Sequence, residues 1–140
     1  MSSDAVTDAD YRQLLELRSG LRRFLRWSAE QARSAGLTPA QHQLLLAVRG
    51  HPDRKGPTVA EVADYLQLKH NSTVELIDRA QRDGLVERHT DPDDARIVRI
   101  GLTPEAESRL AKLSQVHLEE LRRLAPRITA LWSGLDQTTD

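Results

Sequence analysis

TVAEVADYLQLKHNSTVELIDRAQRDG (residues 58–84) and LVERHTDPDDARIVRIGLT (residues 85–103) are the two adjoining stretches that decide the fold of this chain. In the first stretch, apolar residues recur at i, i+3, i+4 and i+7 from Val59, which predicts a short amphipathic helix. A short turn separates it from a second predicted helix over residues 70–83, which ends at a capping glycine, Gly84. Two short helices joined by so tight a turn form a helix-turn-helix.

The second stretch predicts a β-hairpin. Residues 85–90 and 96–102 alternate with the period of strands, and the DPDD sequence at residues 91–94 has the composition of a turn. A helix-turn-helix followed by a hairpin is the order of elements in a winged helix, a domain that typically binds DNA. The fold class expected is therefore mainly α with a small β-hairpin wing.

Helical segments flank this lobe on both sides. Residues 8–33 and 39–50 are predicted helices, the second capped by Thr38 and with a proline in its first position. A long helix is predicted after residue 103, and Pro126 is expected to break or kink it, so that a short final helix follows. The apolar stripes of the first and last helices have helical spacing: Leu14, Leu17, Leu21, Phe24 and Leu25, and Leu110, Leu113, His117, Leu121 and Leu124.

The flanking segments carry more apolar surface than one small lobe can cover. We therefore expect a two-fold homodimer, which would set its two recognition helices roughly 34 Å apart, about one turn of DNA. The organisation expected is a single domain over residues 1–140. Within it, residues 8–50 and 104–136 form dimerisation and scaffold helices, and residues 57–103 form the winged helix-turn-helix lobe.

The composition excludes several classes of protein. Of 140 residues, 39% are apolar and 29% are charged, which suits one domain with a hydrophobic core. The absence of cysteine excludes disulfides, thiolate metal sites and thiol-based redox sensing. No apolar run has the length of a signal peptide or a membrane span, so a cytoplasmic protein without membrane partners is expected.

The charge balance weighs against DNA binding. The whole chain has a net charge of -1, and residues 57–102 hold six basic and nine acidic side chains, a net charge of -3. DNA-binding domains usually show a basic footprint. Contacts with phosphate must therefore come from a few well-placed cations, and long-range electrostatic steering should be weak.

The helix predicted over residues 70–83 has an apolar inner face and a polar outer face, as a helix that enters the major groove requires. Asn71 could pair with adenine, Glu75 could accept from cytosine, and Val74 could contact a thymine methyl. Lys69 is a candidate for a phosphate contact, as is Arg79. The candidates of this recognition helix are Lys69, His70, Asn71, Ser72, Val74, Glu75 and Arg79. The alternative is a helical hairpin whose polar face binds nothing.

In the hairpin turn, Arg96 is the candidate for insertion into the minor groove, where arginine reads the shape of the groove. Asp94, two residues earlier, could orient it by a charge-assisted hydrogen bond. Without such an arginine, a turn with three aspartates should repel DNA. The alternative interpretation of Arg96 is an ordinary surface ion pair, which contributes little.

In this order and spacing, the motifs resemble the MarR (multiple antibiotic resistance regulator) family of transcription factors over nearly the full chain. The matching segments are residues 37–41 (LTPAQ), 59–63 (VAEVA), 74–79 (VELIDR), 84–88 (GLVER), 91–96 (DPDDAR) and 102–106 (LTPEA). The resemblance implies a triangular homodimer on a palindromic operator, with dimer contacts from both terminal helices and regulation by small anionic or phenolic effectors. It also matches Arg96 to the wing-tip arginine of the family and Asp94 to its partner.

The chain departs from the family pattern in three places. Many members have a second basic residue where this chain has Ala95, and Thr-Arg in place of Val74-Glu75. A glutamate in the recognition helix indicates a different operator. The last helix is also shorter than in many members and contains Pro126, which leaves the dimer geometry open.

For an effector site, the candidates are Trp27, His42 and Arg49, near where the first two helices should meet the winged lobe. The alternative is that Trp27 is ordinary packing and His42 a surface residue. The five histidines show no short metal-ligand spacing, and no nucleophile elbow, phosphate loop or metalloprotease motif occurs. We therefore expect no metal, no cofactor and no enzymatic activity.

The function expected is a sequence-specific, homodimeric DNA-binding repressor, released from a palindromic operator by a small-molecule effector. The alternative is a winged-helix module for protein interaction or dimerisation without specific DNA binding, which the net charge of residues 57–102 permits. An accessory domain of an enzyme is set aside, since 140 residues leave no room for a catalytic domain.

Overall fold

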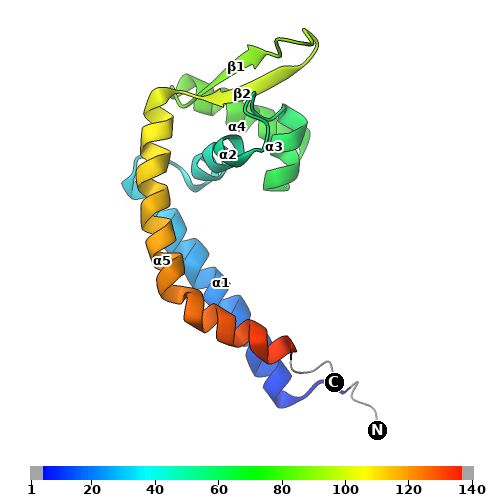
Figure 1. Cartoon of the computed structure of the whole chain (residues 1–140), viewed down its shortest axis with the longest axis vertical. Coiled ribbons are helices and arrows are strands. Elements are labelled where there is room, and N and C mark those ends of the chain that lie inside the picture. The colour runs from blue at the N-terminus through cyan, green and yellow to red at the C-terminus, as the bar shows by residue number, and fades with distance from the viewer. Residues whose placement is uncertain (1–4, 137–140) are drawn as a thin grey trace.

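Two long helices and a small winged lobe make up the chain (Figure 1). The computed structural model describes residues 5–136, the last two by their backbone alone, and residues 1–4 and 137–140 of the expected domain lie outside the described residues. The elements are α1 (Asp8–Ser34), α2 (Pro39–Gly50), α3 (Val59–Leu66), α4 (His70–Arg82), β1 (Val86–Thr90), β2 (Val98–Leu102) and α5 (Pro104–Asp136). The predicted fold class, mainly α with a β-hairpin wing, is confirmed.

Local sequence decides where α2 and α3 begin. The Gln41 N–H donates to the Thr38 hydroxyl at 3.0 Å, and the Thr38 N–H donates back to the Gln41 side chain at 3.1 Å. Thr58 and Glu61 form the same reciprocal capping box at the start of α3. The predicted N-cap at Thr38 is therefore confirmed, and each box satisfies backbone N–H groups that the first helical turn leaves without partners.

The helix-turn-helix is tight because its turns use left-handed backbone. Gln67 ends α3 with a φ of 55°, the left-handed conformation that reverses the chain toward α4. Gly84 follows α4 with a φ of 73°, and the Leu85 N–H donates to the Ala80 carbonyl at 2.9 Å. Gly84 is thus the C-terminal cap that the sequence predicts, and it leads the chain directly into β1.

The hydrophobic core lies in the winged lobe, around α2. Leu44 and Leu45 of α2 are fully buried and belong to one cluster with Val62 of α3, Ile77 of α4 and Ile100 of β2. Burial of each such side chain contributes about 1.5–3 kcal/mol. Because α2 packs against α3, α4 and β2 together, it decides which faces of the helix-turn-helix point inward.

β1 and β2 form an antiparallel hairpin. β1 begins one residue later than the strand predicted over residues 85–90, and β2 begins two residues later than the strand predicted over residues 96–102. Leu85 still belongs to the cap of α4, and Ile97 belongs to the turn, where its N–H donates to the Asp94 carbonyl at 3.0 Å. The turn is therefore longer than the alternation of apolar and polar residues indicates.

The loop of residues 51–57 lies against the hairpin. The Ile100 N–H of β2 donates to the Pro57 carbonyl at 2.9 Å. Gly56 has a φ of 93°, and a Cβ built on it would lie 2.1 Å from the Ile100 carbonyl oxygen. Position 56 therefore requires glycine, because both the backbone conformation and the closeness of β2 exclude a side chain.

We expect Gly56→Ala to lower the free energy of unfolding by about 2 kcal/mol or more, from left-handed strain together with a clash against β2. Gly84→Ala is the matched control, since Gly84 has a similar φ of 73° with nothing within 4 Å of its Cβ position. That variant should lose about 1 kcal/mol from strain alone. Urea unfolding of both variants measures the difference, and equal losses would contradict the clash at position 56.

α5 is one helix that passes through Pro126. The predicted break at Pro126, with a separate short helix after it, is therefore wrong. A proline removes one backbone hydrogen bond of a helix, and the packing of the flanking turns can compensate for that loss. Here the residues after Pro126 still pack on α1, since a Cβ on Gly134 would lie 2.4 Å from the Gln13 amide nitrogen.

α1 and the second half of α5 extend away from the lobe, and α5 bends between the two regions (Figure 1). The contact between Gly134 and Gln13 shows that the two helices run antiparallel, because the end of one meets the beginning of the other. Within residues 5–136, no helix combines the length and apolar character needed to cross a membrane.

Candidate nucleic-acid interface

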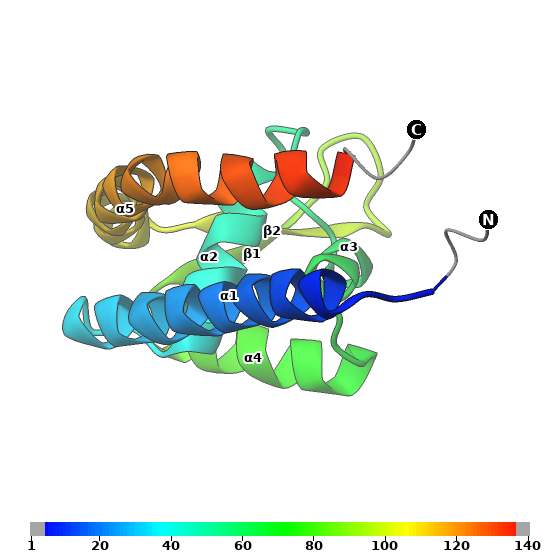
Figure 2. The same ribbon diagram turned by 90° about the horizontal axis from the view of Figure 1, so that it is seen from below.

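α4 lies at the edge of the lobe, on the side away from α5 (Figure 2). Its inner face consists of Thr73, Ile77 and Ala80, all fully buried, as the helical period predicts. Four of the sequence candidates at its beginning are exposed, namely His70, Asn71, Ser72 and Glu75. A fifth, Val74, is half-buried. The outer face of α4 thus offers hydrogen-bonding side chains over its first turn and a half.

The start of α4 differs from the starts of α2 and α3. Lys69 occupies its N-cap position and makes no side-chain capping bond among the described residues. A lysine ammonium can only donate hydrogen bonds, so the first backbone N–H groups of α4 have no side-chain acceptor at the cap. Together with the positive end of the helix dipole, such a start is suited to an anion such as phosphate.

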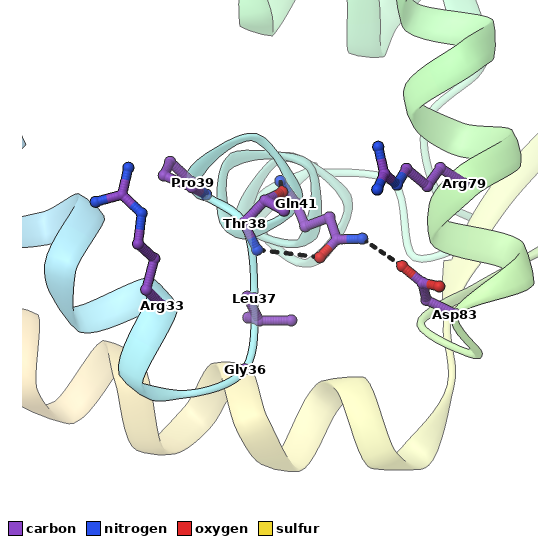
Figure 3. A pocket seen from close by; sticks show the side chains of 8 residues that line it. All are labelled: Arg33, Gly36, Leu37, Thr38, Pro39, Gln41, Arg79 and Asp83. Atoms are coloured by element: carbon purple, nitrogen blue, oxygen red, sulfur yellow. Dashed lines mark hydrogen bonds between the residues drawn. The ribbon is translucent and has the colours of Figure 1, made fainter.

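Arg79 lies beside a shallow hollow of about 350 Å³ between the end of α1, the start of α2 and the end of α4 (Figure 3). Arg33 lies on the opposite side of this hollow. Between them, the Gln41 amide donates to the Asp83 carboxylate at 2.8 Å, and its carbonyl oxygen accepts from the Thr38 N–H. The Gln41 side chain therefore caps α2 with its oxygen and ties α2 to the end of α4 with its nitrogen.

β1 also holds α4 in place. The Arg88 guanidinium donates to the Asp78 carboxylate at 2.6 Å and to the Gln81 side chain at 2.5 Å. Both acceptors lie in the second half of α4. These contacts help set the orientation of the wing relative to α4.

Arg96 extends from the wing turn, with 90% of its side chain exposed. The Asp94 carboxylate accepts from its Nε and its Nη2, both at 3.0 Å, and from its backbone N–H at 3.1 Å. The hydrogen bond with Arg96 lowers the pKa of the Asp94 carboxyl, and Asp94 raises the pKa of the guanidinium. The pair therefore stays ionised at neutral pH, and the two-pronged contact orients a long side chain that water surrounds.

Sequence reasoning missed a buried carboxylate beside this pair. Asp91 is 4% exposed, and the Nε of Arg99 in β2 donates to it at 2.5 Å. That hydrogen bond is the main reason that the pKa of Asp91 falls to about 2. An aspartate at the start of a turn is a recognisable signal, because its carboxylate can accept from the N–H groups of the turn. The role of Arg99 depends on the hairpin register and had no such signal.

Two of the three effector candidates meet around a histidine of α5. The rings of Trp27 and His42 each lie 4.9 Å from the ring of His117. His42 is only 8% exposed, so its interpretation as a surface residue is wrong: the central helix α2 turns this side chain toward α5. Arg49 does not join them, because it pairs with Glu107 at 2.9 Å in an exposed position.

Hydrogen bonds fix the ring of His117. Its Nδ1–H donates to the Leu113 carbonyl at 2.8 Å, since a carbonyl oxygen can only accept, and its Nε2 lies 2.7 Å from the Ser28 hydroxyl. Phe24 packs edge-on against the same ring, at 6.1 Å between centroids. Sequence reasoning had placed His117 on an apolar stripe and had not connected it to His42. Among the described residues, no three histidine, aspartate or glutamate side chains are grouped as a metal site requires.

The pKa of His42 lies below its ordinary value, chiefly because the imidazole is buried and secondly because His117 faces it. Trp27, Phe24 and Ser28 of α1 contact His117. A histidine that binds its proton less readily in the folded chain than in the unfolded chain reduces stability as the pH falls below about 6.5.

We therefore expect the free energy of unfolding to fall as the pH is lowered from about 7.5 to about 5.5, and to fall less in His42→Gln. His70→Gln is the control, because His70 is exposed at the start of α4 and its side chain makes no hydrogen bond or ion pair among the described residues. Urea midpoints of the three proteins at each pH give the comparison. If His42→Gln lost as much stability on acidification as the unaltered chain, the buried imidazole would not be the cause.

The sequence profile of the MarR family matches residues 35–97. The uncharacterized HTH-type transcriptional regulator YsmB of Bacillus subtilis (strain 168) is 39% identical over 72 residues, 51% of this chain and 49% of that protein, so the matched segment spans about half of the relative. The fold matches that of wild-type MarR (apo form) from E. coli, with a TM-score of 0.66 and 20% identity over 98% of this chain and 100% of that one.

A mutant of MepR from S. aureus, solved bound to an oligodeoxyribonucleotide, has the same TM-score of 0.66 with 18% identity, over 97% of this chain and 100% of that one. At such identities the likeness establishes the fold. The profile match and the shared fold confirm the resemblance read from the sequence motifs. Residues 35–97 of the chain therefore match the MarR family in sequence, and nearly the whole chain shares the fold of a solved MarR protein.

Proposed function

We propose that this protein is a homodimeric transcriptional regulator that binds DNA in a sequence-specific manner. The observation that carries the proposal is Arg96, which is 90% exposed and yet held in one orientation by Asp94. An exposed arginine that is already ordered is suited to enter a narrow minor groove, where the negative potential is strongest. The nucleic acid bound to the MepR mutant of the same fold supports the choice of ligand.

In this proposal, α4 enters the major groove. Asn71 is suited to adenine and Glu75 to the amino group of cytosine, and Val74 could contact a thymine methyl. His70 and Ser72 lie in the same first turn of the helix. Phosphate contacts would come from Lys69 and Arg79, and from the backbone N–H groups at the start of α4. Since the winged lobe is net acidic, these few contacts would carry most of the electrostatic attraction.

The homodimer is proposed from the apolar side chains that α1 and α5 leave exposed. The residues follow the same spacing on both helices, i, i+3, i+10 and i+14, which places each set on one stripe. They are 38–61% exposed: Tyr11, Leu14, Leu21 and Leu25 on α1, and Leu118, Leu121, Ile128 and Trp132 on α5. Exposed apolar stripes of this kind are typical of an interface, and a two-fold axis would let the same stripes cover one another.

We propose further that the protein acts as a cytoplasmic repressor, released from a palindromic operator by a small anionic or phenolic effector. The cluster of Trp27, His42 and His117 supports the site, because aromatic rings gather there between the flanking helices and the lobe. A ligand in this position would contact both regions at once. Arg49 is paired with Glu107 outside the cluster, so it is not included.

Selection of bound duplexes from a random pool, with the purified protein, tests the proposal. We expect a palindromic consensus with half-sites one helical turn apart. On the selected duplex, log K should fall linearly with log salt, with a slope that reflects several phosphate contacts. The competing function is a winged-helix module for protein interaction, favoured by the net charge of -3 over residues 57–102. A pool that stays random after repeated rounds would support that alternative.

A further inference from the structure

One of the three aspartates in the wing turn is buried. Asp91 is 4% exposed, whereas the side chain of Asp93, two residues later, is 79% exposed and that of Arg96 is 90% exposed. Burial of a carboxylate is unfavourable unless hydrogen bonds and an opposite charge compensate for the lost water. The surroundings of Asp91 provide both, and each contact leads to a different part of the wing.

One oxygen of Asp91 organises the turn. Its Oδ1 accepts from the backbone N–H of Asp93 at 2.7 Å and from that of Asp94 at 3.1 Å. These bonds shape the segment that carries Asp94, and Asp94 in turn accepts three hydrogen bonds from Arg96. Among residues 5–136, the hydrogen bonds and ion pairs of the Arg96 side chain are all with Asp94, so its orientation depends on this turn.

The other oxygen of Asp91 connects the turn to the body of the lobe. Its Oδ2 accepts from Arg99 Nε at 2.5 Å, and Arg99 Nη1 donates to the Gly56 carbonyl at 2.8 Å and lies 3.9 Å from the Asp53 carboxylate. The Arg99 side chain is only 14% exposed. It therefore links the loop of residues 51–57, which is itself bonded to β2, with the turn at the end of the hairpin.

We propose that Asp91 is a positioning residue for Arg96: held by Arg99 against the loop of residues 51–57, it fixes the turn from which Arg96 reaches the DNA. The inference rests on the proposed function, since it concerns how the wing engages its ligand. Two carboxylates act in series: the buried Asp91 accepts from the backbone of the turn, and the half-buried Asp94 accepts from the guanidinium. Because the pKa of Asp91 is low, its carboxylate stays ionised and keeps these hydrogen bonds at neutral and mildly acidic pH.

A double-mutant cycle on the selected duplex tests the inference. Asp91→Asn is nearly isosteric and removes one negative charge from the wing, a change that by charge alone should tighten DNA binding. If Asp91 acts through Arg96, Asp91→Asn instead weakens binding by roughly 3- to 10-fold, the lower part of the range for groups coupled in one network. In the Arg96→Ala background, the same substitution should leave affinity unchanged or slightly raise it.

Glu87→Gln is the matched control, because it removes the same charge from the wing at an exposed position of β1, where the side chain makes no hydrogen bond or ion pair among the described residues. We expect it to leave affinity unchanged or raise it in both backgrounds. Should Asp91→Asn lose its folded structure by circular dichroism, Arg99→Lys takes its place. That change keeps the charge, but an ammonium cannot reproduce the fixed fork that reaches Asp91 and the Gly56 carbonyl together. It should show the same dependence on Arg96.

The results separate this inference from the proposed function. The positioning role would be overturned if Asp91→Asn weakened DNA binding equally in both backgrounds. It would also be overturned if Asp91→Asn did not weaken binding when made in the otherwise unaltered chain. In both cases the proposed DNA binding would still stand. An unaltered chain that selects no DNA sequence would overturn both. The result expected is a weakening by Asp91→Asn that disappears in the Arg96→Ala background, with no weakening by Glu87→Gln.

Discussion

Replacing Arg96 by alanine is expected to weaken binding to the selected operator by about 5- to 150-fold, without a change in the unfolding midpoint. The side chain is almost wholly exposed, so its removal leaves no cavity and breaks no core contact. It removes the proposed minor-groove contact and leaves the Asp94 charge unbalanced in the wing. The slope of log K against log salt should also decrease by about 1 if the guanidinium replaces one counterion.

Lys112→Ala provides the control for this experiment, because Lys112 is an exposed cation of α5 outside the lobe. It removes the same charge and should leave both the affinity and the salt slope nearly unchanged. Fluorescence anisotropy with a labelled duplex at several salt concentrations yields both quantities. An Arg96→Ala isotherm that coincides with that of the unaltered chain would remove the wing from the mechanism.

Replacing Leu25 by glutamate is expected to weaken self-association by about 100-fold or more, because it places a carboxylate in an apolar interface. Leu25 is 60% exposed in the single chain, so the free energy of folding of the chain itself should change little. DNA binding should fall with dimerisation, since two linked half-site contacts gain about 100-fold or more over one. Analytical ultracentrifugation measures the dimer, and anisotropy measures the loss on the operator.

Gln115→Glu is the matched control for the dimer, as it adds the same charge at an exposed polar position of α5. It should leave the sedimentation profile unchanged. A dimer that persists in Leu25→Glu would mean that the exposed stripe of α1 faces solvent in the assembly. A dimer lost equally in both variants would indicate a general effect of charge in place of a specific apolar contact.

Much of the fold could be predicted because its determinants lie within a few residues of one another. Thr38 and Thr58 cap helices through residues three positions further on, and Gly84 ends α4 through its own φ. The contact of Asp94 with Arg96 also spans only two residues, which is why the wing pair could be proposed from the turn sequence.

The misses concern side chains that meet across long stretches of chain. The sequence leaves His42 as either an effector candidate or a surface residue, whereas its ring lies 4.9 Å from that of His117, because the packing of α2 against α5 brings them together. Arg49 was grouped with Trp27, but the α2–α5 contact instead pairs it with Glu107. Pro126 is predicted from the sequence to break or kink the last helix, with a short helix after it, but the helix continues through it and packs along α1.

By itself, the sequence determined the elements: which residues form helices, where caps and turns lie, and that a charged hairpin follows a helix-turn-helix. Those features depend on backbone preferences and on hydrogen bonds between residues close in the sequence, so they can be predicted from short segments of the chain. Only the tertiary structure decided that Arg99 reaches from β2 both to Asp91 and to the Gly56 carbonyl. That junction exists because the loop of residues 51–57 packs on β2, and such packing follows from the whole core.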